Sequence, residues 1–323
     1  MTTTALVTGC SSGIGHETAR ALLEHGWRVY ATARDRDRDG LEPLADRGAD
    51  IAALDLTEPD AIERVVSRIR EETGGVDCLV NNAGYGQFGP VEDVPTSLLE
   101  RQFAVHCFGP HRLIRAVLPG MRRRGRGRIV TVTSAADRLA LAGIGGYTAS
   151  KWAMASLSDA LRQELADTDI EVVVVQPGIV KTPFYDRAVR AVDDAAAATR
   201  NETRLSPATT APDRTVTVVQ PDHYTDLYRV LRRLRAVEGG GPFVNDPERV
   251  ASTIREAATA RNPDTHYRVG PVPLLGSLYG TLVPGTIRDR LTRLGIRIGA
   301  SEPVLELLER RMADADAERY PPR

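Results

Sequence analysis

Short apolar runs alternate along this chain with longer segments of helical periodicity, and this alternation limits the possible folds more than any other feature. Segments such as 17–24 and 61–70 carry apolar residues on one side and arginine and glutamate on the other, which predicts amphipathic helices. The run Val172–Val175 is continuously apolar, as expected of a central strand covered on both faces. The sequence therefore predicts an α/β fold with a doubly wound parallel sheet. The predicted strands are Ala5–Thr8, Arg28–Ala33, Ile51–Leu56, Val76–Val80, Arg128–Thr133 and Glu171–Val175.

The second half of the chain departs from this rhythm. Residues from about 184 to 245 are rich in alanine, threonine, arginine and proline with weak periodicity, which predicts a lid insertion. Asp246 followed by Pro247 predicts a helix start, and the helix should run to about Ala260. Residues Tyr267–Val269 are expected to add an edge strand. We therefore expect one domain over residues 1–270, with the lid at about 184–245, and a helical C-terminal extension over 271–323.

Composition narrows the classes of partner. The chain of 323 residues has 42 Lys and Arg against 43 Asp and Glu, a balance that favours neither nucleic acid nor an anionic membrane as partner. The arginine cluster at 122–128 lacks interleaved aromatic residues and is interpreted as a solvated loop. Three scattered cysteines and no metal constellation predict neither a zinc site nor a disulfide framework. No signal peptide and no run of about 18 apolar residues is seen, so a soluble cytoplasmic protein is expected.

A glycine-rich segment, Thr8–Gly15, joins the first predicted strand to the first predicted helix. Gly9 would permit the tight turn, Gly13 would let backbone N–H groups approach a pyrophosphate, and Gly15 would let the helix pack against the strand. This placement favours the dinucleotide-binding turn of a Rossmann fold over a glycine-rich turn without a ligand.

Further motifs, in the same chain order, resemble the short-chain dehydrogenase/reductase family. The glycine segment matches its Thr-Gly-x-x-x-Gly-x-Gly spacing, and Asn81–Gly84 matches its Asn-Asn-Ala-Gly element. Asp55 occupies the position of an aspartate that lies against the adenine ring, and Pro177-Gly178 with Thr182 resembles the segment at the nicotinamide end. The resemblance implies that the cofactor is bound by Gly9, Ser11, Ser12, Gly13, Ile14, Gly15, Arg34, Asp55, Leu56, Asn82, Ala83, Gly84, Tyr147, Lys151, Pro177, Gly178, Val180 and Thr182.

The second strand suggests which nicotinamide cofactor is used. An acidic residue at the end of this strand selects the free ribose 2′-hydroxyl of NAD, whereas a cation accommodates the 2′-phosphate of NADP. Here Ala33 stands where NAD-preferring relatives carry aspartate, and Arg34 follows with a fork suited to phosphate. Ser11 could add a hydroxyl contact. NADP(H) is therefore favoured, although Arg34 could instead be a solvated turn residue.

The resemblance also implies a catalytic set of Ser134, Tyr147 and Lys151. Tyr147 and Lys151 stand at i and i+4, on one face of a helix, and Ser134 lies thirteen residues before Tyr147. A phenol with a pKa near 10 needs nearby positive charge to act as a base, which Lys151 and the oxidised nicotinamide would supply. Tyr147 would then exchange a proton with the substrate oxygen, Ser134 would hydrogen-bond that oxygen, and Lys151 would hold the ribose. Alone, a Tyr-x-x-x-Lys pair is more often structural.

One position departs from the family pattern. Many members carry a catalytic asparagine within a segment like Phe-x-Val-Asn-x-x-Gly, where this chain has His106. That asparagine helps to hold a water molecule that connects the lysine to solvent. His106 could be a working substitute in this proton relay, a packing residue in an enzyme without the relay, or a sign of altered chemistry.

The sequence thus predicts reversible hydride transfer between NADP(H) and a carbonyl or secondary alcohol. Segments Thr8–Gly15 and Val29–Arg34 resemble the steroid and retinol dehydrogenase branch, which implies a fairly large apolar substrate, such as a steroid-, polyketide- or lipid-like molecule. Two alternatives stay open: a non-redox epimerase or lyase that uses His106, and an NADP-binding sensor without turnover. Relatives commonly pair through the helix that bears Tyr147, so a homodimer or homotetramer is expected.

Overall fold

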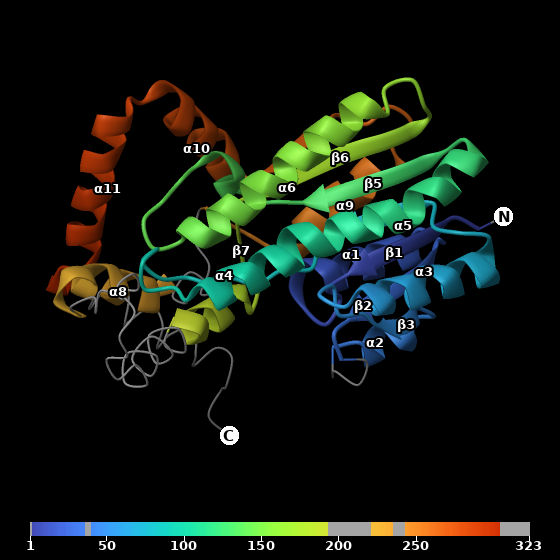
Figure 1. The fold of residues 1–323 in the computed structure, drawn as a ribbon, viewed down its shortest axis with the longest axis horizontal. Helices are drawn as coiled ribbons and strands as arrows, with labels where there is room; N and C mark the ends of the chain where they lie inside the picture. Colours follow the sequence, from blue (N-terminus) through green and yellow to red (C-terminus); the bar gives the residue numbers. More distant parts are fainter. Residues whose placement is uncertain (1, 36–39, 193–220, 235–242, 304–323) are drawn as a thin grey trace, which may run out of the picture.

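The protein is built around a seven-stranded sheet in which every neighbouring pair of strands is parallel, as the computed structural model shows (Figure 1). The structure describes residues 2–35, 40–192, 221–234 and 243–303. The strand order is β3-β2-β1-β4-β5-β6-β9, so the chain reverses its direction of travel across the sheet between β1 and β4. The strands are β1 (Thr4–Thr8), β2 (Arg28–Ala33), β3 (Asp50–Ala53), β4 (Cys78–Asn81), β5 (Gly127–Val132), β6 (Ile170–Pro177) and β9 (His266–Val269).

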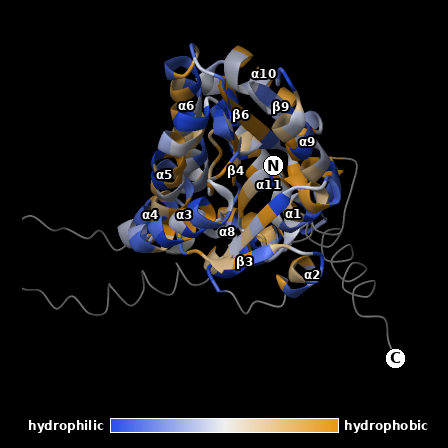
Figure 2. Cartoon of the chain, turned by 90° about the vertical axis from the view of Figure 1, so that its right-hand side faces the viewer, coloured by the Kyte–Doolittle hydropathy of each residue, from blue (hydrophilic) through white to orange (hydrophobic). Residues whose placement is uncertain are grey.

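Helices cover both faces of the sheet, and alternate strand residues feed two separate cores. In β1, Ala5 and Val7 face one core and Leu6 faces the other, because successive side chains of a strand point to opposite faces. In Figure 2 central strands such as β6 are coloured as hydrophobic, and the surrounding helices carry both hydrophobic and hydrophilic residues. The first core is closed by α1 (Gly13–Glu24), α2 (Glu42–Ala45) and α9 (Pro247–Thr259), and the second by α3 (Pro59–Thr73), α5 (Gly109–Arg124) and α6 (Gly145–Glu164).

This architecture confirms the predicted α/β fold, and the observed strand bounds differ from the predicted ones by up to three residues, most at the end of the third strand. The third strand was expected to reach Leu56 but ends at Ala53, and the fifth was expected to reach Thr133 but ends at Val132. Leu54 and Leu56 are buried although they lie in the following loop, so apolar character continues past the point where strand pairing stops. The predicted helix at 247–260 forms as α9 and ends at Thr259.

The carboxyl ends of the strands carry the connections that shape the site. After β6, the short strand β7 (Ile179–Val180) pairs with β8 (Val244–Asn245), and residues 184–192 are helical. The rest of the expected lid that the structure describes holds a 3₁₀ turn (Pro221–Tyr224) and α8 (Thr225–Arg232). Residues 193–220 and 235–242 of the lid, and 304–323 of the expected extension, lie outside the described residues.

Two further helices, α10 (Pro271–Leu282) and α11 (Gly285–Gly299), follow the last strand. They lie with α8 at the carboxyl end of the sheet, at the left of Figure 1, and α11 packs on α8. Among the described residues, no helix combines the length and apolar character needed to cross a bilayer.

Candidate active site

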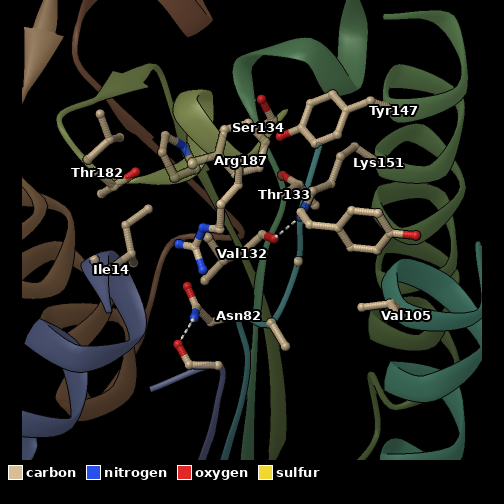
Figure 3. Close-up of a pocket in the computed structure, with 18 of the residues that line it drawn as sticks. Ile14, Asn82, Val105, Val132, Thr133, Ser134, Tyr147, Lys151, Thr182 and Arg187 are labelled. Carbon is tan, nitrogen blue, oxygen red and sulfur yellow. Dashed lines mark hydrogen bonds between the residues drawn. The ribbon is translucent and has the colours of Figure 1, made fainter. Parts of the chain in front are cut away.

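A cavity of about 670 Å³ runs along the carboxyl ends of the strands, where the strand order reverses. In open α/β sheets this crevice is the place where ligands bind. Figure 3 shows Ile14 of α1 on one wall and Tyr147 and Lys151 of α6 on the other. Every cofactor-binding and catalytic residue predicted from the sequence lines this cavity except His106, which lies behind the wall.

The glycine turn has the conformation that a dinucleotide requires. Gly9 and Gly13 have φ values of 77° and 61°, in the left-handed region that favours glycine. A Cβ atom on Gly9 would come within 2.8 Å of the Cα of Ala83, and one on Gly15 within 2.3 Å of the carbonyl oxygen of Gly9. Ser12 caps α1 with an extended backbone, so the first N–H groups of the helix are available to an anion. The turn therefore fits a pyrophosphate.

Asn82 ties this turn to the centre of the sheet. Its side-chain amide donates a hydrogen bond to the carbonyl oxygen of Thr8 over 2.8 Å (Figure 3). The hydroxyl of Thr8 accepts hydrogen bonds from the backbone N–H groups of Asn82 and Ala83, each over 3.0 Å. These contacts hold the end of β4 and the glycine turn in register.

At the other end of the turn, Arg34 and Asp55 lie on the cavity wall. Arg34 is exposed directly after β2, where a ribose 2′-substituent would be read. Burial opposes ionisation of Asp55, but hydrogen bonds from Thr57 and the positive charges of Arg34 and Arg101 outweigh it and lower the pKa of the carboxyl group. Asp55 is therefore an anion at neutral pH, able to accept a hydrogen bond from an amino group.

Tyr147, Lys151 and Ser134 meet at the middle of the cavity. Tyr147 and Lys151 project from the same face of α6 and are 9% and 7% exposed. The ammonium of Lys151 donates a hydrogen bond to the carbonyl oxygen of Val132 over 3.0 Å (Figure 3). Ser134 follows β5 and caps a 3₁₀ turn, its hydroxyl accepting a hydrogen bond from the N–H of Ala136. The three functional groups thus come from two neighbouring elements.

Burial determines the protonation states of Tyr147 and Lys151. It raises the pKa of Tyr147 to about 12, against the opposing effect of the hydrogen bond with Ser134. It lowers the pKa of Lys151 to about 8, against the opposing negative charge of Asp137. At neutral pH Tyr147 is therefore a neutral phenol with a proton to give, and Lys151 is predominantly a cation.

His106 is held by two hydrogen bonds in a five-residue π-helical segment, Ala104–Phe108, between α4 (Thr96–Phe103) and α5. Nε2 accepts a hydrogen bond from the backbone N–H of Tyr85 over 3.0 Å. Nδ1 lies 2.8 Å from the hydroxyl of Ser150, which itself donates to the carbonyl oxygen of Tyr147 over 2.7 Å. Because a serine hydroxyl has one hydrogen, Nδ1 must be the donor, and the imidazole is the neutral Nδ1–H tautomer.

The environment keeps this imidazole neutral. Burial first, and the positive charge of Lys151 second, hold the pKa of His106 well below its ordinary value. Since both ring nitrogens are engaged with protein atoms, the side chain has no nitrogen left for a relay water in this arrangement. The geometry therefore favours a positioning role over a proton-relay role.

The outer part of the cavity is apolar and aromatic. The ring of Phe184 lies 5.6 Å from the ring of Tyr147, and that of Phe88 lies 5.7 Å from it, both edge-on. Tyr185 stacks edge-on against Phe184. Leu139, Leu141, Ile144, Leu234 and Val272 complete this wall.

Two features of the site were not predicted from the sequence. Arg187, in the lid, donates from Nη2 to the hydroxyl of Ser12 over 2.9 Å, a contact between residues 175 positions apart. Asp137 is buried behind the site and accepts hydrogen bonds from Thr133 over 2.6 Å and from Gln176 over 2.8 Å. Its position three residues after Ser134 is the available signal, because an acidic residue there is typical of a helix start. The sequence contains no comparable signal for the contact of Arg187 with Ser12.

The comparisons with known proteins agree with this geometry. Residues 3–192 match a family described as short chain dehydrogenase. The chain is 31% identical over 294 residues to the uncharacterized oxidoreductase YbbO of Escherichia coli (strain K12), covering 90% of this chain and 94% of that protein. It is 31% identical to retinol dehydrogenase 5 of Mus musculus, covering 88% of this chain and 85% of that one.

Solved structures give the same result. A short-chain dehydrogenase from Streptomyces avermitilis superposes with a TM-score of 0.67 at 29% identity, covering 93% of this chain and 98% of that one. A metagenomic short-chain oxidoreductase in complex with NADP superposes with a TM-score of 0.60 at 26% identity, covering 83% of this chain and 97% of that one.

Proposed function

The chain belongs to the short-chain dehydrogenase family, and we propose that it reduces a large apolar ketone or aldehyde with NADPH. An oxidoreductase and a retinol dehydrogenase are among its relatives. The observation that carries this proposal is the meeting of Tyr147, Lys151 and Ser134 in one cavity with a glycine turn at its far end. The reverse reaction, oxidation of the corresponding alcohol, uses the same groups.

The bound nicotinamide supplies a hydride for the carbonyl carbon, and the protein supplies the proton. Tyr147, neutral because burial raises its pKa to about 12, donates its phenolic proton to the carbonyl oxygen as negative charge develops there. Ser134 stabilises the same oxygen by a hydrogen bond. Lys151, placed one helical turn after Tyr147, stabilises the phenolate that remains and is positioned to hold the ribose hydroxyls. In the oxidative direction the phenolate of Tyr147 accepts the proton of the alcohol, and the hydride would pass to the oxidised cofactor.

For the cofactor we favour NADP(H) over NAD(H). Arg34 lies at the end of β2 on the cavity wall, and Ala33 leaves no carboxylate at this position to bind a free 2′-hydroxyl. A guanidinium can bind a phosphate with two parallel hydrogen bonds. The NADP complex of the metagenomic relative is consistent with this preference.

For the substrate we favour a large apolar molecule. Phe88, Phe184 and aliphatic side chains form much of the wall beyond Tyr147, and they offer dispersion contacts and no hydrogen bonds. The similarity to retinol dehydrogenase 5 supports an apolar alcohol or carbonyl compound. Ser134 and Tyr147 supply the polar contacts that would orient its oxygen.

For His106 we propose a positioning role rather than a catalytic one. The imidazole links Tyr85, which lines the cavity, to Ser150 on the helix that bears Tyr147 and Lys151. It thereby fixes the distance between the Asn82–Tyr85 loop and α6. This role gives no support to an epimerase or lyase mechanism that uses His106 as an acid or base.

The test is reduction of a panel of bulky apolar ketones and aldehydes by NADPH, with wild type compared with Tyr147→Phe. We expect the variant to bind NADPH within about twofold of wild type and to lose turnover by about a hundredfold or more, since general acid catalysis contributes 10²–10⁴. A variant that retains full turnover would refute the role of Tyr147. A wild-type protein that binds NADPH but converts no substrate would favour the sensor alternative, and conversion without net NADPH consumption would favour the non-redox one.

A further inference from the structure

Arg187 reaches from the lid across the cavity to the glycine turn. Its Nε donates a hydrogen bond to the carbonyl oxygen of Pro183 and its Nη2 to the hydroxyl of Ser12, each over 2.9 Å. Figure 3 shows the guanidinium between Ile14 of α1 and the backbone of β5 near Val132. The side chain therefore crosses the part of the cavity that connects the glycine turn to the catalytic set.

Two positive groups lie next to each other on this side of the cavity. A guanidinium carries a full positive charge, and the first turn of α1, which carries the positive end of the helix dipole, contains no acidic residue. The hydroxyl of Ser12 makes no capping bond within α1 and accepts from Arg187 instead. A diphosphate between the turn and Arg187 would lie against both positive groups, with the planar fork of arginine matched to its oxygens.

The same helical segment also forms the substrate wall. Phe184 stands three residues before Arg187, so the two side chains share one side of the 184–192 segment, and both line the cavity. Phe184 in turn contacts the ring of Tyr147. The position of Arg187 and the shape of the wall above the reacting carbon are therefore linked through one rigid turn of helix.

On the premise that the cavity binds NADP(H), as proposed above, we propose that Arg187 binds the pyrophosphate of the cofactor and thereby draws the 184–192 segment into the position that completes the substrate wall. The contact is independent of Arg34, which addresses the 2′-phosphate at the other end of the turn.

The experiment compares Arg187→Gln, Arg187→Lys and Arg34→Gln with a matched control, Arg190→Gln. Arg190 lies on the same segment, is exposed, does not line the cavity and pairs with Asp186 over 2.8 Å. Dissociation constants are measured by calorimetry for NADPH, for NADH, and for adenosine 2′-phosphate, which lacks a pyrophosphate. Hydrogen exchange of residues 184–192 is measured with and without NADPH.

We expect Arg187→Gln to weaken NADPH and NADH by the same factor, about tenfold to a hundredfold for one charge-assisted contact, and to leave adenosine 2′-phosphate within about twofold. Arg187→Lys should lose less affinity for NADPH and NADH than Arg187→Gln does, because lysine keeps the positive charge but cannot form two parallel hydrogen bonds. Arg34→Gln should weaken the binding of NADPH and of adenosine 2′-phosphate but not the binding of NADH. NADPH should protect residues 184–192 from exchange in wild type and in Arg190→Gln, and not in Arg187→Gln.

The inference is overturned if Arg187→Gln binds both dinucleotides as wild type does, if it weakens adenosine 2′-phosphate as much as NADPH, or if NADPH protects the 184–192 segment equally in wild type and variant. These outcomes leave the proposed function intact, since wild type still binds the cofactor. A wild-type protein that binds neither dinucleotide would instead overturn the proposed function, and this inference with it.

Discussion

Replacing His106 with phenylalanine tests whether this residue has the proposed positioning role between Tyr85 and Ser150. Phenylalanine keeps a planar ring of similar size but has no nitrogen, so the N–H of Tyr85 and the hydroxyl of Ser150 both lose a partner. A buried donor left without an acceptor costs about 1–3 kcal/mol, and one neutral hydrogen bond contributes about 1 kcal/mol. Because Ser150 keeps its bond to Tyr147, we expect the free energy of unfolding to fall by about 2–4 kcal/mol at neutral pH.

The same residue should give stability a particular pH dependence. Its pKa in the folded state lies well below 6.5, so in the unfolded state the imidazole binds a proton that the folded state excludes. The contribution of neutral His106 to the free energy of unfolding is therefore fully present above about pH 6.5. It is lost as the pH falls toward the folded-state pKa, by about 1.4 kcal/mol at pH 5.5. The phenylalanine variant has no such group, so the difference between the two proteins should shrink by about that amount between pH 7.5 and 5.5.

Urea unfolding followed by tryptophan fluorescence at both pH values measures these differences. His111→Gln, which removes an exposed histidine from α5, serves as the control and should stay within about 0.5 kcal/mol of wild type. A free energy of unfolding of His106→Phe within about 0.5 kcal/mol of wild type at neutral pH would refute the positioning role, because the loss of two buried hydrogen bonds should cost more than this. A pH-independent difference would show that His106 is not held neutral.

Three further predictions concern the cavity. Because burial lowers the pKa of Lys151 to about 8, kcat/KM for ketone reduction should be level near neutral pH and fall about tenfold per unit well above pH 8; a profile still level at pH 10 would refute a role for the ammonium. Arg34→Gln should reduce the preference for NADPH over NADH in kcat/KM by about tenfold or more, and an unchanged ratio would place the 2′-phosphate elsewhere. Gly13→Ala should weaken both dinucleotides, because the position has φ 61° and an added Cβ would lie 2.9 Å from Thr182; wild-type affinities measured by calorimetry would contradict this.

Sequence reasoning succeeded where the signal is local. Gly9 and Gly13 adopt the positive φ values that a tight turn requires, and Tyr147 and Lys151 share a helix face because they are four residues apart. It misplaced the end of β3 because Leu54 and Leu56 are apolar in a loop that packs on the core, so hydrophobicity did not distinguish strand from buried loop.

Contacts between segments far apart in the chain could not be predicted from the sequence. The tautomer of His106 depends on Tyr85 and Ser150, which lie 21 and 44 residues away, and no pattern in the chain pairs them. Arg187 meets Ser12 because residues 184–192 lie beside the start of α1 in the folded chain. In both cases the residue type was visible, but its chemical state or role is set by tertiary packing.

The compactness of the segment from Thr182 to Arg187 matters to anyone who would redesign this enzyme. Within six residues it places Thr182 against the glycine turn, Phe184 against Tyr147 and Arg187 against Ser12. Exchanging this loop for that of another enzyme, as a way to change which ketone is accepted, would also exchange part of the surface around the glycine turn. Substrate range is more safely altered at Leu141, Ile144 or Val272, which line the cavity from other parts of the chain.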